Sequence, residues 1–338
     1  MSTHQAPHSH GPVDVHAHWY PKAFLELLAE RGPAHGVEWH EIEGKGPQFK
    51  VGYLTTGPAG PRYVDLDARL AAMDEQGVKV HALSLSQPMV YWAGRDLGER
   101  LAATYNEALA RAHERAPQRL VGLATLPMHE PDLAVKEAER AAQLSGVRGF
   151  YLSTRVNDRD LSDPAFIPVF ERIEALGLPI FLHPVFVIAH ERLQQHYLTN
   201  LLGNPFESAI AAAHLIFGGV LDRCPHLTFV LPHAGGAFPW LVGRLSRGWE
   251  KRPELKGTSR HPPVEYLRRF YYDTVGYSDD VLDYLVRVIG ADRVLMGSDY
   301  CFPIAYERPV ENVTAHPQLD DAAKHAITEA NAVRLLKL

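Results

Sequence analysis

The sequence predicts an α/β protein built as one (β/α)₈ barrel of the TIM type, with a small insertion after the first strand. Eight short apolar runs lie along the 338 residues, and most are separated by a stretch with helical periodicity. Several runs, such as residues 179–185, are apolar almost throughout, as expected for parallel strands covered on both faces. Strand and helix alternating eight times are typical of a closed parallel barrel. A doubly wound open sheet is the alternative, but it gives no reason for the histidine positions described below.

The predicted strands follow one another along the chain at residues 13–19, 79–86, 120–127, 147–154, 179–185, 227–233, 270–275 and 293–299. Amphipathic stretches between them predict helices at residues 66–76, 97–116, 132–144, 164–176, 205–222 and 280–289. The fourth of these helices has clear boundaries, because Asp163 precedes Pro164 as an N-cap and Gly177 follows the last turn.

Two segments interrupt this alternation. Residues 31–63 are rich in Gly and Pro and predict a small insertion above the first strand. Residues 186–204 follow the fifth strand as a long loop, and long loops at that end of a barrel usually shape a substrate pocket. We expect residues 1–12 to be a disordered tail and residues 13–338 to form one domain.

Composition and charge exclude several classes of protein. The net charge of −6 and the lack of a Lys/Arg run argue against a nucleic-acid partner. No apolar stretch of the sequence is long enough to span a bilayer, so no membrane partner is expected. The first residues lack the basic and apolar segments of a secretion signal, and two cysteines, Cys224 and Cys301, do not make a disulfide framework. We therefore expect a cytoplasmic protein.

The first predicted strand ends with two histidines. His16 and His18 are two residues apart, so both side chains point to the same side of a strand and can bind one ion. A His-x-His pair is common by chance, but this pair lies at the C-terminal end of a barrel strand, where barrel enzymes place their active sites. Asp14 is expected to be structural.

Three later strands also end in a polar residue. His183 closes the run PIFLH, His233 closes FVLPH and Asp299 closes VLMGSD, each at a position where an unpartnered polar group is costly. Taken singly, such a histidine is more often a satisfied strand-end residue, and such an aspartate more often caps a loop. Together, His16, His18, His183 and Asp299 predict a catalytic Zn²⁺ site with an open position for water, Mn²⁺ being the alternative ion. His233 is then free to act as an acid or base.

The ordered motifs His16-Ala-His18, His183-Pro, His233-Ala-Gly-Gly and Gly-Ser-Asp299-Tyr resemble those of the amidohydrolase superfamily, and more narrowly the branch that contains 2-amino-3-carboxymuconate-6-semialdehyde decarboxylase. The resemblance extends from residue 13 to the C-terminal segment. It implies that the four residues above are the metal ligands and that His233 and Asp299 are catalytic. Binuclear relatives use a lysine or glutamate from the fourth strand, which is absent from VRGFYLS, so one metal is expected.

An arginine is expected to hold the substrate carboxylate, because its planar fork matches a carboxylate with two parallel hydrogen bonds. The segment after His233 resembles the one that delivers an arginine into the neighbouring subunit's pocket, which makes Arg244 the candidate and a homodimer the expected assembly. The alternative is an exposed helix arginine. A second substrate arginine is expected in the insertion, where Arg62 is the nearest candidate. Trp19 and Tyr20 are candidates for an aromatic wall.

Two residues differ from those usual in this branch, so the sequence does not identify the substrate. Val185 stands where a tryptophan is usual, and Cys301 stands where a proline is usual. Residues of the long loop are further candidates for substrate contact or for loop packing; they are Phe186, His190, Arg192, His196 and Tyr197.

The sequence therefore predicts a metal-dependent nonoxidative decarboxylase, a carbon–carbon lyase acting on an aromatic or muconate-type carboxylic acid. A metal-dependent hydrolase of an amide or lactone is the alternative, followed by a hydratase of an unsaturated dicarboxylate. A metal-binding regulatory or scaffold protein is a hypothesis from another class. His233 argues against it, because such a protein does not need a free acid or base.

Overall fold

The computed structural model describes residues 10–255 and 257–338. Residues 1–9 of the expected tail lie outside the described residues. Pro12, the last residue of the expected tail, is held against the barrel. Its carbonyl oxygen accepts hydrogen bonds from the N–H groups of Lys79 and Val80 at 2.8 and 3.1 Å.

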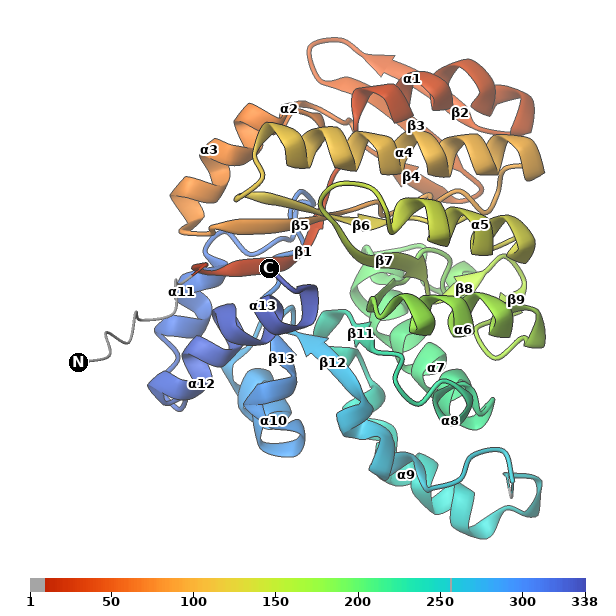
Figure 1. The fold of residues 1–338 in the computed structure, drawn as a ribbon, viewed down its shortest axis with the longest axis vertical. Coiled ribbons are helices and arrows are strands. Elements are labelled where there is room, and N and C mark those ends of the chain that lie inside the picture. The colour runs from red at the N-terminus through yellow and green to blue at the C-terminus, as the bar shows by residue number, and fades with distance from the viewer. Residues whose placement is uncertain (1–9, 256) are drawn as a thin grey trace.

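Eight parallel strands form one sheet that curls into a barrel with helices around it (Figure 1). In sheet order the strands are β1 (Val13–His18), β5 (Val80–Ser84), β6 (Leu120–Ala124), β7 (Val147–Ser153), β10 (Ile180–His183), β11 (Phe229–Leu231), β12 (Phe270–Asp273) and β13 (Val294–Leu295). The barrel closes where Ala17 pairs with Tyr300 and the Val15 N–H donates to the Met296 carbonyl at 3.0 Å. The predicted (β/α)₈ barrel is confirmed, and the open-sheet alternative is wrong.

Nearly every residue of these strands is buried, as the apolar runs predicted. The sheet is covered inside by its own side chains and outside by helices, so both faces of each strand exclude water. The principal helices are α1 (Lys22–Arg31), α3 (Leu66–Gln76), α4 (Arg95–Arg115), α5 (Pro131–Ala141), α6 (Ile167–Leu176), α7 (Asn204–Phe217), α8 (Val220–Arg223), α9 (Phe238–Lys251), α10 (Asp279–Ile289), α11 (Pro309–Thr314), α12 (Asp321–His325) and α13 (Asn331–Leu336).

Two predicted helices differ in detail from the structure. The helix expected at 205–222 is broken into α7 and α8, because Gly219 adopts a left-handed conformation with φ 71° that interrupts the helical path. The helix expected at 164–176 opens with a 3₁₀ turn before α6. Its predicted boundaries are confirmed, since the Asp163 side chain accepts a hydrogen bond from the Ala165 N–H and Gly177 ends the helix with φ 64°.

The segment expected as an insertion contains a small antiparallel sheet, seen at the top of Figure 1. Its strands are β2 (Glu38–Ile42), β3 (Gly46–Val51) and β4 (Leu54–Thr56), and the short helix α2 (Pro61–Val64) leads back towards α3. Trp39 stacks on Phe49 with ring centroids 5.7 Å apart, which fixes β2 against β3. The sheet brings the β3–β4 turn to the mouth of the barrel, where its side chains line the pocket described below.

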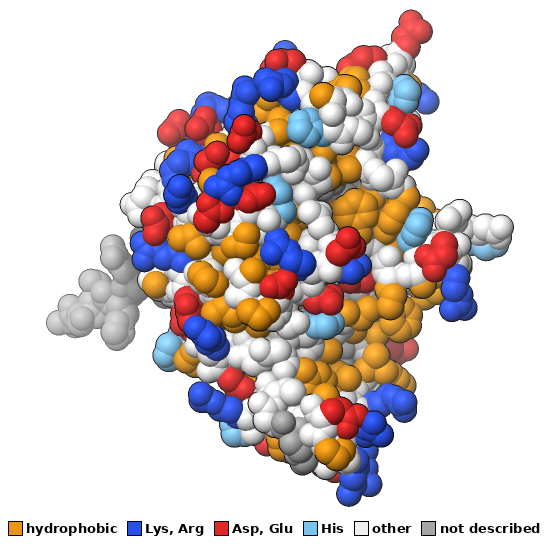
Figure 2. Space-filling model, turned by 90° about the vertical axis from the view of Figure 1, so that its right-hand side faces the viewer, with side chains coloured by type: hydrophobic (Ala, Val, Ile, Leu, Met, Phe, Trp, Pro, Cys, Tyr) orange, Lys and Arg blue, Asp and Glu red, His pale blue; other side chains and the backbone are white. Residues whose placement is uncertain are grey.

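The surface carries both signs of charge. On the face shown in Figure 2, basic and acidic side chains are interspersed over most of the surface, and hydrophobic side chains gather between them. Among the described residues, no helix is both long and apolar enough to cross a membrane.

Candidate metal centre and substrate pocket

Four side chains converge at the C-terminal mouth of the barrel. One ligand atom from each of His16, His18, His183 and Asp299 can be chosen so that all four atoms lie within 4.8 Å of one another, and all four residues are buried. His16 and His18 come from the end of β1 and His183 from the end of β10, while Asp299 follows β13. Since parallel strands all end at the same face of a barrel, residues far apart in the sequence meet there.

Each histidine of the cluster is oriented through its Nδ1 atom. Nδ1 of His16 lies 2.6 Å from Oδ2 of Asp273, and Nδ1 of His18 lies 3.0 Å from Oγ of Ser84. His183 donates from Nδ1 to the carbonyl oxygen of Pro184 at 2.8 Å. All three rings therefore turn Nε2 towards the centre of the cluster. Such outer partners fix the ring orientation and the tautomer of metal-binding histidines.

The donor atoms fit a divalent metal ion. Nε2 of His16 lies 3.1 Å from Nε2 of His18, and Oδ1 of Asp299 lies 3.1 Å from Nε2 of His18. Nε2 of His183 is buried and has no hydrogen-bond partner within the described chain. A buried nitrogen without a partner is costly, and binding an ion would satisfy it. Three nitrogens and one carboxylate oxygen are ligands that Zn²⁺ prefers.

The histidines of this cluster differ in the direction of their pKa shifts. Burial opposes protonation of His16, but its hydrogen bond to Asp273 and the charge of Asp299 outweigh burial and raise its pKa to about 9. Burial, followed by the positive charge of neighbouring histidines, holds the pKa values of His18 and His183 well below the usual range. Two of the rings are thus neutral near pH 7, the form that binds a metal, while His16 must release a proton to do so.

His233 lies beside these residues. Its ring centroid is 5.4 Å from that of His16 and 5.3 Å from that of His183, and its Nδ1 is buried without a hydrogen-bond partner among the described residues. Burial and the charge of His16 lower its pKa, so the ring is neutral and ready to accept a proton.

The backbone around His233 explains the Ala-Gly-Gly that follows it. His233 and Ala234 adopt left-handed conformations with φ 56° and 55°, and a Cβ atom at Gly236 would collide with the carbonyl oxygen of Pro205. The Ala234 N–H donates to Asp273 at 2.8 Å, so one carboxylate fixes both this turn and His16. Asp299 is also left-handed, with φ 66°. Such conformations in non-glycine residues cluster at functional sites.

Asp273 is a functional residue that sequence reasoning missed. It ends β12 after the buried run Phe-Tyr-Tyr and is only 2% exposed. A carboxylate within an apolar run, where an unpartnered polar group is costly, could have indicated it. The predicted strand extended over residues 270–275, so Asp273 lay inside the strand and the strand-end position that identified Asp299 did not single it out.

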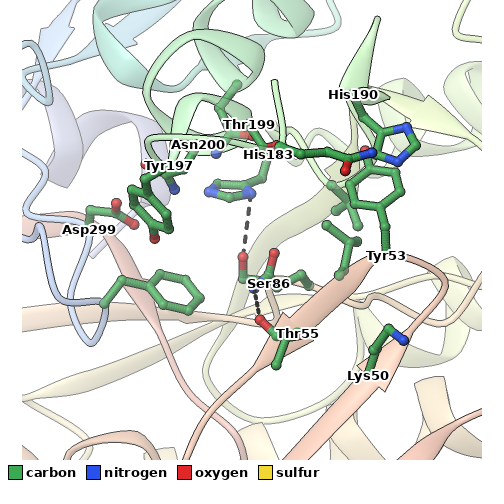
Figure 3. A pocket seen from close by; sticks show the side chains of 16 residues that line it. Lys50, Tyr53, Thr55, Ser86, His183, His190, Tyr197, Thr199, Asn200 and Asp299 are labelled. Atoms are coloured by element: carbon green, nitrogen blue, oxygen red, sulfur yellow. Dashed lines mark hydrogen bonds between the residues drawn. The ribbon is translucent and has the colours of Figure 1, made fainter. Parts of the chain in front are cut away.

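A cavity of about 480 Å³ opens above the cluster (Figure 3). His183 and Asp299 form its floor, and the loop after β10 and the β3–β4 turn form its walls. Most of the lining side chains are polar and uncharged or aromatic; the lining residues include Thr55, Gln87, Val185, Gln194, Tyr197, Thr199, Asn200, Asn204 and Phe302. Lys50 is the one Lys or Arg among the residues that line this cavity in the described chain. A pocket of this size and lining suits a small polar molecule with a planar ring.

Tyr53, in the β3–β4 turn, packs against the loop after β10 and so connects the two walls of the pocket. Its ring stacks on His190 with centroids 3.9 Å apart and an interplanar angle of 9°, and its hydroxyl oxygen accepts a hydrogen bond from the Val187 N–H at 2.6 Å. Phe186 contacts the Tyr53 ring edge-on. The insertion and the loop after β10 are therefore one structural unit around the pocket.

The other candidate substrate residues lie elsewhere. Trp19 and Tyr20 are buried behind the pocket wall, where they donate hydrogen bonds to the carbonyl oxygens of Val64 and Gln87 at 2.9 and 2.7 Å. Arg62 lies over the ring of Tyr300, 4.8 Å from its centroid. None of the three lines the cavity.

The remaining loop candidates and Cys301 divide between the surface and the interior. His190 and Tyr197 line the cavity, whereas Arg192 and His196 are exposed. Cys301 is 1% exposed, and burial raises the pKa of its thiol to about 12, so it is not a reactive thiolate.

Arg244 is exposed on α9, which projects from the barrel at the lower right of Figure 1. It does not line the cavity of its own chain. Near it lies Trp240, which is 77% exposed. The Trp240 ring lies against that of Tyr284, with centroids 5.7 Å apart.

A closed parallel barrel with three histidines and one aspartate at its C-terminal mouth, and a further free histidine beside them, defines a metal-dependent barrel enzyme. Comparison with known proteins gives the family. The family model described as Amidohydrolase matches residues 13–338, and the chain belongs to this family.

Relatives extend over nearly the whole chain. A 2-amino-3-carboxymuconate-6-semialdehyde decarboxylase of Dictyostelium discoideum is 30% identical over 329 residues, covering 96% of this chain and 91% of the relative. A gamma-resorcylate decarboxylase of Polaromonas sp. is 29% identical over 301 residues, covering 82% of this chain and 89% of the relative. The crystal structure of 5-carboxyvanillate decarboxylase from Sphingomonas paucimobilis is 28% identical with a TM-score of 0.84, covering 97% of this chain and 99% of that one.

Proposed function

We propose that this protein is a mononuclear metal-dependent decarboxylase that removes CO₂ from an aromatic or muconate-type carboxylic acid without an oxidant. The observation that carries the proposal is the neutral His233 beside the four-ligand cluster, two of whose members, His183 and Asp299, form the floor of a polar and aromatic pocket. A metal-binding scaffold does not need such a base. The relatives that match most of the chain are decarboxylases of carboxylic acids by name, which supports the reaction type.

In the proposed mechanism His16, His18, His183 and Asp299 hold one divalent ion, Zn²⁺ by ligand preference with Mn²⁺ as the alternative. When bound, the ion supplies a Lewis acid that attracts substrate oxygens and stabilises negative charge. The bond between the carboxylate and the carbon that bears it breaks, CO₂ leaves, and the electron pair stays on that carbon. His233 first accepts a proton from water or from a substrate hydroxyl, and then passes it to that carbon, where it replaces CO₂.

The substrate carboxylate needs a cationic partner, and two residues are proposed for this role. Lys50 faces the cavity from β3, although it also pairs with Glu38 at 2.8 Å. Arg244 of a second copy of the chain would be the other, as expected from the sequence. Tyr20 would act indirectly by supporting the wall that carries Gln87, Trp19 by its hydrogen bond to Val64, and Arg62 by its contact with Tyr300.

A homodimer fits the distribution of exposed apolar side chains. Several lie on segments that follow β10, β11 and β12, on the same side of the barrel as the pocket; they are Ile188, Tyr197, Leu201, Leu202, Phe206, Trp240, Tyr277 and Val281. Burying these side chains against a second copy would remove them from water, which is favourable. We therefore propose a dimer in which α9 of each subunit approaches the other's pocket.

The proposal is tested by incubating the purified, metal-loaded protein with a panel of single-ring hydroxybenzoates and carboxymuconate semialdehydes. CO₂ release and the decarboxylated product are measured together. Stoichiometric CO₂ from at least one acid supports the lyase. Turnover of amides or lactones, with no CO₂ from any acid, would replace it by the hydrolase alternative.

A further inference from the structure

Arg69, on α3, is a fully buried arginine behind the metal cluster. Its exposure is 0%, and it is the largest of the fully buried side chains in the described chain. Arginine is almost never fully buried unless it is paired with a carboxylate. Among the described residues no carboxylate lies within ion-pair distance of this guanidinium. Its burial therefore needs another explanation.

The contacts of Arg69 lie where the barrel closes. Nη2 donates a hydrogen bond to the carbonyl oxygen of His18, and the guanidinium carbon lies 4.6 Å from the centroid of the Tyr300 ring. The His18 N–H in turn donates to the Tyr300 carbonyl. One side chain thus holds the end of the first strand and the residue directly after Asp299. These are two of the segments that carry metal ligands.

The same guanidinium also reaches other positions of these two segments through His81 and Asp14. Nη1 of Arg69 lies 3.1 Å from Nδ1 of His81, which must be unprotonated to accept this bond, so the proton of a neutral ring is on Nε2. That Nε2 lies 3.5 Å from Oδ2 of Asp14, a close polar contact that does not meet the geometry of a hydrogen bond. Asp14 accepts hydrogen bonds from the N–H groups of His16 and Ser298 at 2.9 and 3.1 Å.

We propose that Arg69 is a positioning residue of the metal centre: together with His81 and Asp14, it fixes the backbone of the first and last barrel strands so that His16, His18 and Asp299 converge. This inference rests on the metal site of the proposed function. It gives a reason for burying a cation without a carboxylate partner: Nη2 is used by the backbone of the ligand His18 and Nη1 by the imidazole of His81, while Nε has no hydrogen-bond partner among the described residues.

A second arginine of the chain provides a matched control. Arg119 also donates to a strand carbonyl, that of Lys79 at 2.8 Å, and it pairs with Asp74 at 2.7 Å. Lys79 directly precedes β5, so this contact lies at the end of the barrel opposite to the metal cluster. Substituting Arg119 removes a structural arginine without touching the segments that carry the ligands.

The test compares Arg69→Met, Arg69→Lys and Arg119→Met in the full-length protein. Zn²⁺ affinity is measured on the metal-free protein by competition with a chromophoric chelator, and ligand geometry by the visible absorption of the Co²⁺ form. Folding is checked by circular dichroism and Tm. Arg69→Met is expected to weaken Zn²⁺ binding by about 10-fold to 100-fold and to change the Co²⁺ absorption. Arg69→Lys, which keeps the charge and one donor, is expected to lie between Arg69→Met and the parent.

Arg119→Met is expected to lower Tm while keeping the Zn²⁺ affinity and the Co²⁺ spectrum of the parent. A folded Arg69→Met with unchanged affinity and spectrum would overturn the positioning role. If Arg69→Met does not fold, unchanged binding by Arg69→Lys has the same meaning. Failure of the parent protein to bind either metal would instead overturn the metal centre itself, and this role with it.

Discussion

Nδ1 of His16 lies 2.6 Å from Oδ2 of Asp273, although 257 residues separate the two in the sequence. The same carboxylate accepts the N–H of Ala234 at 2.8 Å, directly after His233. A single side chain at the end of β12 therefore orients one metal ligand and the turn that carries the candidate acid–base residue.

Asp273→Asn is expected to weaken metal binding by about 10-fold to 100-fold, because the amide is a poorer partner for the His16 ring and holds its orientation less firmly. Chelator competition on the metal-free protein measures this directly. Asp292→Asn, on an exposed carboxylate that pairs with Arg268, is the control and should bind metal like the parent. Equal affinities in all three proteins would contradict the role given to Asp273.

Metal binding should depend on pH through His16. Because its pKa is raised to about 9, the ring of the metal-free protein carries a proton at pH 7, and a metal ion must displace it. Affinity should therefore rise as the pH rises and level off near pH 9. Calorimetry in buffers of different ionisation enthalpy should detect about one proton released per ion near pH 7. Binding without proton release, or affinity that falls with rising pH, would refute this assignment.

His233→Asn is expected to separate binding from catalysis. The ring is not among the four clustered ligands, so metal content should stay at the level of the parent. The rate of CO₂ release should fall by about 10²-fold to 10⁴-fold, the usual contribution of a general acid or base. Loss of the metal in this variant would mean that His233 is a ligand. An unchanged rate would remove it from the mechanism.

The metal ligands could be predicted from the sequence, because a polar ligand at the end of a strand interrupts an apolar run. His183 and Asp299 are visible in this way, and the barrel then brings them to His16 and His18. Lys50 and Tyr53 were not predicted, since their place at the pocket depends on how the insertion folds over the mouth. Arg69 looked like any polar residue of an amphipathic helix, and only the packing of α3 against the closing strands buries it.

Lys50→Met is expected to raise KM for the acid by about 10-fold, the loss of one hydrogen bond between charged groups, with little effect on metal content. Glu38→Gln removes only the carboxylate that pairs with Lys50, and should lower KM or leave it unchanged. Steady-state kinetics of CO₂ release compares the two variants. Equal KM values in Lys50→Met and the parent would exclude Lys50 as the carboxylate partner.

Arg244 can be tested by mixing subunits. Arg244→Ala and His233→Asn are each expected to be nearly inactive. After unfolding and refolding together, half of the dimers would carry one intact site, restoring about a quarter of the parent activity in a symmetric dimer. Activity that stays at the level of the separate variants would mean that Arg244 serves its own chain or has no role.

The most direct measurement is metal content per chain, taken together with CO₂ release, for the parent protein and His183→Ala. We predict about one Zn²⁺ or Mn²⁺ per chain and CO₂ release from a planar acid in the parent, with both lost in the variant, since it removes one of four ligands. A parent protein that binds no metal, or one that releases CO₂ equally well after His183→Ala, would contradict the account.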